Sequence, residues 1–113
     1  MTKPVPFCGQ VIVKLSDGSK VTIYGSKLTS EGLHVESDYK SDKKTQLEIM
    51  FSVLLGEKAK MIEATVEVIG CTYQGSKQNY RIEFKFKSIK DDGREIIERY
   101  IASRANTSPS YVR

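Results

Sequence analysis

The stretch Tyr80-Arg81-Ile82-Glu83-Phe84-Lys85-Phe86-Lys87 decides the fold class of this chain. Its apolar and charged side chains alternate strictly, which is the period-two pattern of a β-strand. The aromatic and aliphatic members predict a buried face, and the arginine, glutamate and lysines predict a solvated one. A strand with two such faces is typical of an antiparallel sheet that packs on its core from one side.

The same alternation recurs upstream and predicts five further short strands, at 11–15, 21–24, 33–35, 47–53 and 62–68. The dipeptide Asp17-Gly18 between the first two is the strongest short-range signal for a hairpin. Residues 36–45 are polar and predict a surface loop, and residues 74–79 predict the loop of the last hairpin. Strands at hairpin spacing indicate a small barrel or curled sheet.

The period changes after Asp91-Asp92-Gly93, where aspartate suits a helix N-terminus. The apolar residues that follow recur at helical spacing and form one stripe: Ile96, Ile97, Tyr100 and Ile101. We therefore expect an extended arm over 1–9, a barrel over 10–88, a helix over 92–104 and a frayed tail over 105–113. The fold class is all-β with a C-terminal helix, as a small six-stranded antiparallel β-barrel in one domain spanning 1–113.

Composition narrows the cellular setting. No run of apolar residues is long enough for a membrane helix, and the first residues lack a secretory signal. Cys8 and Cys71 lie far apart, which favours two reduced, partly buried thiols over a disulfide. These features predict a cytoplasmic protein without a membrane span. The net charge of +4 is compatible with an anionic ligand and equally with a solvated surface.

Residues suited to catalysis are scarce. His34 is the only histidine, so neither a catalytic triad nor a two-histidine metal site can form, and we expect it packed or at a rim. The glycines are scattered and form no phosphate-binding loop. We predict that the chain is not an enzyme and has no metal site and no cofactor.

Three segments together resemble the PilZ domain, the bacterial barrel module that responds to cyclic di-GMP. They are residues 27–35, residues 64–69 with the strand at 80–86, and the helix at 94–101. The likeness covers about residues 9–104 and rests on pattern more than on single residues. It implies a six-stranded barrel and a role in cyclic di-GMP signalling.

In that family an R-x-x-x-R pair on the N-terminal arm and a D/N-x-S-x-x-G turn hold the dinucleotide. Here the turn reads Lys27-x-Thr29-x-x-Gly32, with Ser30 inside it, and Lys3 is the only cation of the arm. A lysine ammonium donates hydrogen bonds and accepts none, so Lys27 does not replace Asp or Asn. Glu83 also stands where the family usually has glycine.

The loss can be given a size. If each bidentate arginine contact is worth ~1–3 kcal/mol, losing both costs roughly 2–6 kcal/mol, or about 30-fold to 10⁴-fold in affinity. The resemblance thus implies a degenerate ligand site, with Lys3, Lys27, Thr29, Ser30 and Gly32 as its candidate residues and cyclic di-GMP as at most a weak ligand. We expect the protein to act through contacts with another protein in motility, pilus or biofilm regulation.

Two alternatives stay open. One is a genuine cyclic di-GMP receptor that uses a lysine-based site. The other is a small basic barrel that binds nucleic acid, which is disfavoured because glutamates fall on the predicted solvated faces. Single exposed apolar residues predict a monomer or a weak dimer.

Overall fold

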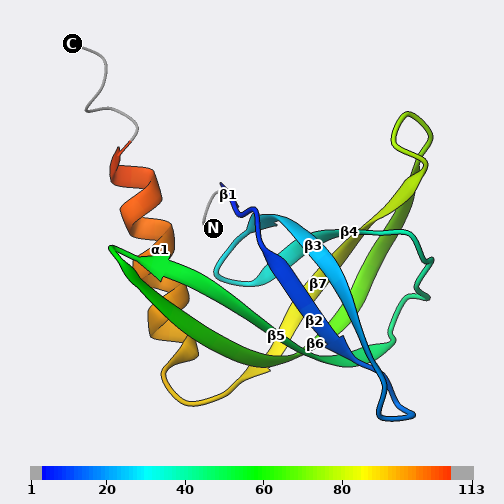
Figure 1. Cartoon of the computed structure of the whole chain (residues 1–113), viewed down its shortest axis with the longest axis horizontal. Coiled ribbons are helices and arrows are strands. Elements are labelled where there is room, and N and C mark those ends of the chain that lie inside the picture. Colours follow the sequence, from blue (N-terminus) through cyan, green and yellow to red (C-terminus); the bar gives the residue numbers. More distant parts are fainter. Residues whose placement is uncertain (1–3, 108–113) are drawn as a thin grey trace.

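The computed structural model describes residues 4–107, which form seven strands and one helix (Figure 1). The strands are β1 (Val5–Pro6), β2 (Gln10–Lys14), β3 (Lys20–Leu28), β4 (Gly32–Ser37), β5 (Gln46–Leu55), β6 (Lys58–Gln74) and β7 (Asn79–Ile89), and the helix is α1 (Gly93–Thr107). Every pairing is antiparallel, in the order β1-β3-β2-β5-β6-β7-β4. An additional β3–β4 pairing closes six strands into a barrel, with β1 as an extra strand on its edge. The predicted fold class is confirmed.

The side chains of β7 alternate between the inside and the outside of the barrel, as predicted. Ile82, Phe84 and Phe86 are buried inside the barrel, whereas Arg81 and Lys85 are exposed. The predicted Asp17-Gly18 turn is also present, since Gly18 has φ +90° and the Ser19 amide and hydroxyl donate to the Asp17 carboxylate over 2.9 and 2.6 Å. Local pattern thus fixes both the face of a strand and the position of a turn.

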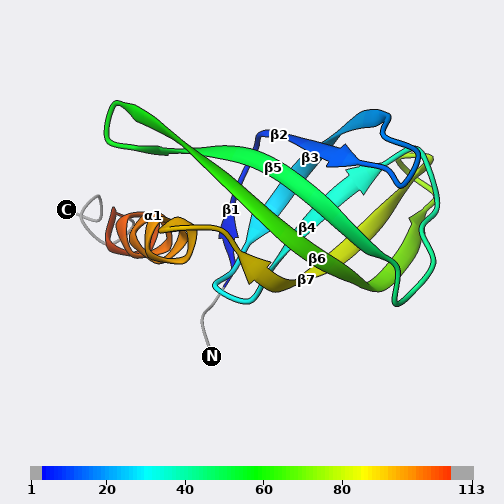
Figure 2. The same cartoon turned by 90° about the horizontal axis from the view of Figure 1, so that it is seen from below.

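Helix α1 covers one end of the barrel (Figure 2). Its predicted apolar stripe is buried, namely Ile96, Ile97, Tyr100 and Ile101. The Asp92 carbonyl accepts a hydrogen bond from the Ile96 amide over 3.1 Å, which places Asp92 at the N-cap. The helix extends to Thr107, beyond the predicted end at 104, and residues 108–113 of the predicted tail lie outside the described residues.

The N-terminal arm is part of the core, which the sequence did not predict. Val5 and Pro6 pair with β3, and the Phe7 ring is buried 5.4 Å from the ring of Phe51 and 6.4 Å from that of Tyr100. A Cβ at Gly25 would overlap the Phe7 ring, so the glycine makes room for it. The Tyr100 hydroxyl donates to the Pro6 carbonyl over 3.3 Å and joins the helix to the arm.

Several predicted strand bounds were too narrow, and one predicted thiol environment was wrong. The largest difference is in β6, which runs from Lys58 to Gln74 rather than over 62–68, because it pairs with β5 and β7. Strand β3 continues through Gly25 to Leu28, because β4 and β1 flank it and satisfy its backbone groups. Strand β4 likewise continues to Ser37, since β7 pairs along its whole length. Cys8 is exposed rather than partly buried, because its neighbour Phe7 takes the inward position. Among the described residues no helix could cross a membrane.

Candidate functional site

The turn between β3 and β4 contains most of the candidate site residues. Thr29, Ser30 and Glu31 connect the strands, and Gly32 opens β4. Lys27 lies within β3 rather than in the turn, with an exposed side chain. The fifth candidate, Lys3, lies outside the described residues. The sequence therefore located the turn correctly but set its first residue too early.

The Thr29 hydroxyl is fully occupied inside this turn. It accepts the Glu31 amide over 3.0 Å and the Gly32 amide over 2.9 Å, and it donates to the Gly32 carbonyl over 3.3 Å. A hydroxyl has one donor and two acceptor sites, so all three are used. The Thr29 amide donates to the same Gly32 carbonyl over 2.9 Å. This side chain closes the turn and keeps no hydrogen-bonding capacity for a ligand.

Gly32 has a structural reason to be glycine. A Cβ at this position would overlap the Phe84 carbonyl of the neighbouring strand β7. Next to it, the Phe86 amide donates to the Glu31 carbonyl over 2.8 Å and fixes the turn on β7. The Gly of the turn therefore serves the barrel wall, whether or not a ligand approaches.

A guanidinium does reach the turn, from an element that sequence reasoning did not connect with it. Arg94, at the start of α1, is exposed and donates from Nη1 to the Ser30 carbonyl over 3.2 Å. The two residues are 64 positions apart, so only the packing of the helix brings them together. Sequence spacing gives no signal for such a contact.

A shallow groove of about 410 Å³ runs along the outside of the barrel from this turn. Thr29 and Gly32 line it, but Lys27 does not. The other lining residues come from the arm, the turn, β4, β6 and β7: Pro4, Glu31, His34, Ile69, Glu83, Phe84 and Lys85. His34 is half-buried there, which is the predicted rim position.

The charges of the groove do not suit an anionic ligand. Cross-strand pairing places Lys27, His34 and Glu83 side by side on β3, β4 and β7, so Glu83 occupies the outer face of the barrel. Within the groove, the carboxylates of Glu31 and Glu83 outnumber the single ammonium of Lys85. Two carboxylates near a dinucleotide with two phosphates raise its free energy of binding.

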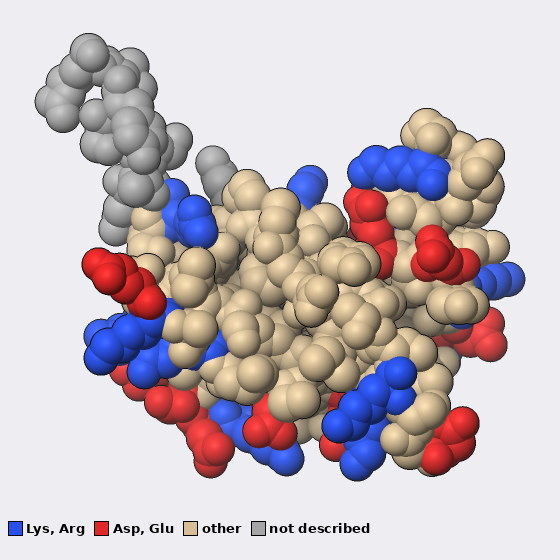
Figure 3. Space-filling view, viewed as in Figure 1, with Lys and Arg blue, Asp and Glu red and all other residues tan. Residues whose placement is uncertain are grey.

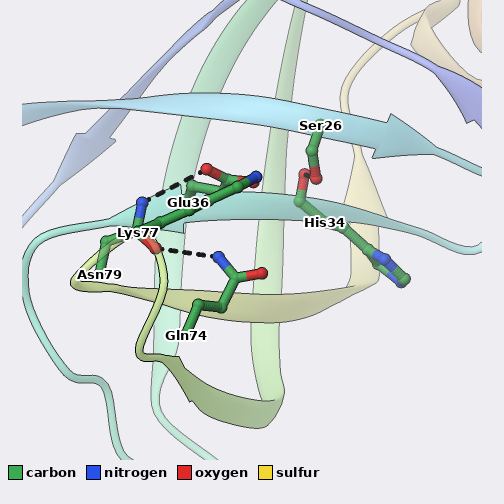
Figure 4. Close-up of polar contacts among 6 residues, drawn as sticks. All are labelled: Ser26, His34, Glu36, Gln74, Lys77 and Asn79. Atoms are coloured by element: carbon green, nitrogen blue, oxygen red, sulfur yellow. Dashed lines mark hydrogen bonds and ion pairs between the residues drawn. The ribbon is translucent and has the colours of Figure 1, made fainter.

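A second polar cluster lies farther along β4 (Figure 4). Glu36 accepts from the Lys77 ammonium over 3.0 Å and from the Asn79 amide over 3.3 Å, which ties the β6–β7 hairpin to β4. The Lys77 hydrogen bond lowers the pKa of Glu36 below its ordinary value of 4.5, against the opposing effect of desolvation, and Asn79 adds to the lowering. In Figure 4 the His34 side chain points away from this cluster, so it belongs to the groove.

Cations and carboxylates are mixed on the outer surface. Figure 3 shows an uncharged centre with lysines, arginines and carboxylates interspersed around it. Two further ion pairs join neighbouring strands or segments, Lys87–Glu67 at 3.3 Å and Lys90–Glu63 at 3.6 Å. Within residues 4–107 no three His, Cys, Asp or Glu side chains are grouped as metal ligands.

The closed six-stranded barrel, its extra strand and its C-terminal helix define the PilZ fold, and solved structures confirm this. The chain is similar to the Bacillus subtilis inhibitor of motility MotI/DgrA, with a TM-score of 0.84 and 10% identity over 93% of this chain and 50% of that one. It is similar to the PilZ domain of YcgR from Escherichia coli, solved with c-di-GMP, with a TM-score of 0.69 and 13% identity over 96% and 93%.

A third similar structure is MrkH from K. pneumonia in its apo state, with a TM-score of 0.75 and 13% identity over 98% of this chain and 52% of that one. The chain thus spans about half the length of MotI/DgrA and MrkH. No protein-family model matches the sequence. No curated protein matches it either. The likeness to known proteins therefore shows the PilZ fold.

Proposed function

We propose that this chain is a PilZ-type regulatory domain of bacterial cyclic di-GMP signalling whose dinucleotide site is degenerate. It binds cyclic di-GMP weakly at most, has no catalytic activity, and acts in the cytoplasm through a contact with another protein of a motility, pilus or biofilm system. The observation that carries this proposal is the Thr29 hydroxyl, whose three hydrogen-bonding sites are all used within the turn.

Residues in and around the turn support the same proposal. Lys27 brings no acceptor, the groove beside Gly32 contains Glu31 and Glu83, and no arginine precedes residue 81. Arg94 donates to the backbone of Ser30, which uses part of its guanidinium within the protein. A guanine base would have to compete with the Ser30 carbonyl for the Arg94 guanidinium, and with the Glu31 and Gly32 amides for the Thr29 hydroxyl.

A protein contact is supported by an apolar pair on the β5–β6 hairpin. Leu54 and Met61 are 57% and 56% exposed, and they lie on the outer side of the two strands, where Ser52 pairs with Met61. Contiguous exposed apolar surface marks a partner site when it is large enough, and this pair would form part of such a surface. The pair is small, so we propose that the isolated chain is a monomer or a weak dimer, which light scattering over a concentration series would test.

The experiment for the ligand site is a calorimetric titration with cyclic di-GMP, with the E. coli YcgR PilZ domain as positive control. We expect no saturation by this chain up to ~1 mM ligand, since a micromolar site that loses two arginine contacts becomes millimolar or weaker. The double variant Glu31→Gln/Glu83→Gln should bind more tightly than the native chain, because it removes the repulsion in the groove.

The lysine-based receptor makes the opposite prediction. Saturable binding near or below ~10 μM that is abolished by Lys27→Ala or Arg94→Ala would replace our proposal with that alternative. Arg94 is included because it is the guanidinium that the described structure places at the turn.

A further inference from the structure

The two ends of the barrel differ in how they are closed. Helix α1 and the arm cover one end, and the β2–β3 turn and the loop at 38–45 lie at the other (Figure 2). At this second end Leu15, Val21 and Leu47 pack on the core but remain half-buried. They border a cavity of about 500 Å³ that opens to solvent between the turn and the loop.

Polarity changes along this cavity. Its walls are aliphatic side chains from β2, the turn after it, β3, β5 and β7, with Phe84 beside them: Val13, Leu15, Val21, Ile23, Leu47 and Ile82. Its polar lining residues lie at the end of β4 and in the following loop, among them Ser37, Lys40 and Asp42. The interior is therefore apolar, and the mouth is polar.

The interior requires no hydrogen bond from a ligand. Ser37 is the buried polar residue that lines the cavity, and its hydroxyl accepts the Tyr39 amide over 3.0 Å. No buried side-chain nitrogen or oxygen among residues 4–104 lacks a partner. A molecule that binds there therefore gains by covering apolar surface and needs no polar group against these walls.

The size and shape of the cavity limit the occupant. Small-molecule pockets measure about 300–1,000 Å³, and this cavity lies in that range. Core side chains fill the barrel itself, with Val13, Ile82 and Phe84 at most 3% exposed, so an occupant lies at the open end over Leu15, Val21 and Leu47. Apolar protein cavities of roughly 150 Å³ bind molecules as simple as benzene.

We propose that this cavity binds one unbranched aliphatic chain of an amphiphile, such as a fatty acid, with its polar head at the mouth beside Lys40. The aliphatic walls cover the chain, and the loop at 38–45 borders the head. Tyr39 is 72% exposed in this loop and lies where its ring can contact a bound head group. The site is at the open end of the barrel, whereas the groove beside Gly32 lies along its outer wall, so the two sites are separate.

The test is a methyl NMR titration of the native chain with decanoate below its micelle concentration. We expect saturable shifts of the Val21, Leu47 and Ile82 methyl signals and no such shifts at exposed Leu54 and Met61, which serve as internal controls. Butanoate, which has the same head and a shorter chain, should bind at least tenfold more weakly. Equal shifts at Leu54 and Met61, or no saturable shift, would overturn the proposal.

Two further measurements sharpen the test. Phosphatidylcholine vesicles added in place of decanoate distinguish a membrane lipid from a free amphiphile as the source of the aliphatic chain. If the vesicles shift the methyl signals of the cavity, the ligand is a lipid. If they do not, the ligand is a free amphiphile. Val21→Phe fills the cavity and should weaken decanoate binding at least tenfold, while Leu54→Phe at the hairpin should leave it unchanged. Amide spectra show whether Val21→Phe is folded, and the native methyl map stands if it is not. A folded Val21→Phe that binds decanoate like the native chain contradicts the assignment.

Discussion

Gly32 lies so close to the backbone of Phe84 that a side chain at position 32 would overlap the Phe84 carbonyl oxygen. The contact joins β4 to β7 directly beside the turn at 29–32. A glycine that resembles part of a ligand motif is thus required by the barrel wall itself. The same turn can persist for structural reasons after its ligand-binding role is lost.

Gly32→Ala should therefore lower the free energy of unfolding. Inserting a methyl group into a packed site costs typically 1–3 kcal/mol, and here the obstacle is backbone. Gly75→Ala is the matched control, because its added Cβ would meet only the Tyr73 ring at 3.9 Å. Urea unfolding should place the two variants at least ~1 kcal/mol apart. Equal stability would show that β4 and β7 can separate at no cost.

Thr29→Val should destabilise the turn, because the valine has nearly the same shape but makes none of the three hydroxyl hydrogen bonds. Leaving partly buried backbone amides without that acceptor costs about 1–3 kcal/mol. Thr29→Ser keeps the hydroxyl and should stay close to the native stability. If Thr29→Val unfolds at the same urea concentration as the native chain, the hydroxyl is not needed by the fold.

Stability should fall at acid pH partly through Glu36. The pKa of this carboxyl is lowered in the folded state, mainly by the Lys77 hydrogen bond, so its contribution is complete above about pH 4.5 and is lost as the pH falls through the lower folded value. Lys77→Met should flatten this part of the pH profile. Because the Lys77 side chain is 56% exposed, solvent screens the pair, and the effect at neutral pH should be within ~1 kcal/mol.

The control for that profile is Lys43→Met, which removes an exposed lysine in the loop at 38–45. It changes the net charge by the same amount without touching Glu36. Thermal unfolding from pH 3 to 7 compares the three chains. A profile of Lys77→Met that matches the native one would show that Lys77 does not hold Glu36 ionised.

Phe7→Ala should cost about 3–5 kcal/mol, since it removes a buried aromatic ring from the junction of arm, barrel and helix. Its neighbour Cys8 is exposed, so Cys8→Ala should change the stability by less than ~0.5 kcal/mol. Chemical denaturation of both variants checks this. If Phe7→Ala lowers the free energy of unfolding by less than ~1 kcal/mol, the arm does not contribute to the core of the barrel.

Local pattern in the sequence predicts much of this fold and little of its groove. Strict alternation in β7 identified the inward face, and Asp17-Gly18 identified a hairpin, because both signals lie within a few residues. Gly25 was read as the end of a strand, whereas it makes room for the Phe7 ring, 18 residues earlier. Such a role depends on which segments pack together.

The site shows the same division. The turn at 29–32 was found from its own sequence, but its partners come from β7 and α1. Glu83 reaches the groove through the β4–β7 register, about 50 residues away along the chain. Arg94 reaches the Ser30 carbonyl of the turn through the helix packing, 64 residues away. The family resemblance singled out Glu83 as a departure from glycine, but nothing in the sequence connects Arg94 with Thr29.

The amide signals of Glu31 and Gly32 report on the central claim most directly, because both groups donate to the Thr29 hydroxyl. We would follow them by ¹H–¹⁵N NMR while cyclic di-GMP is added to ~1 mM, the range expected for a site without its arginine contacts. Our account predicts that neither signal approaches saturation. Saturating shifts of both amides in the low micromolar range would contradict it.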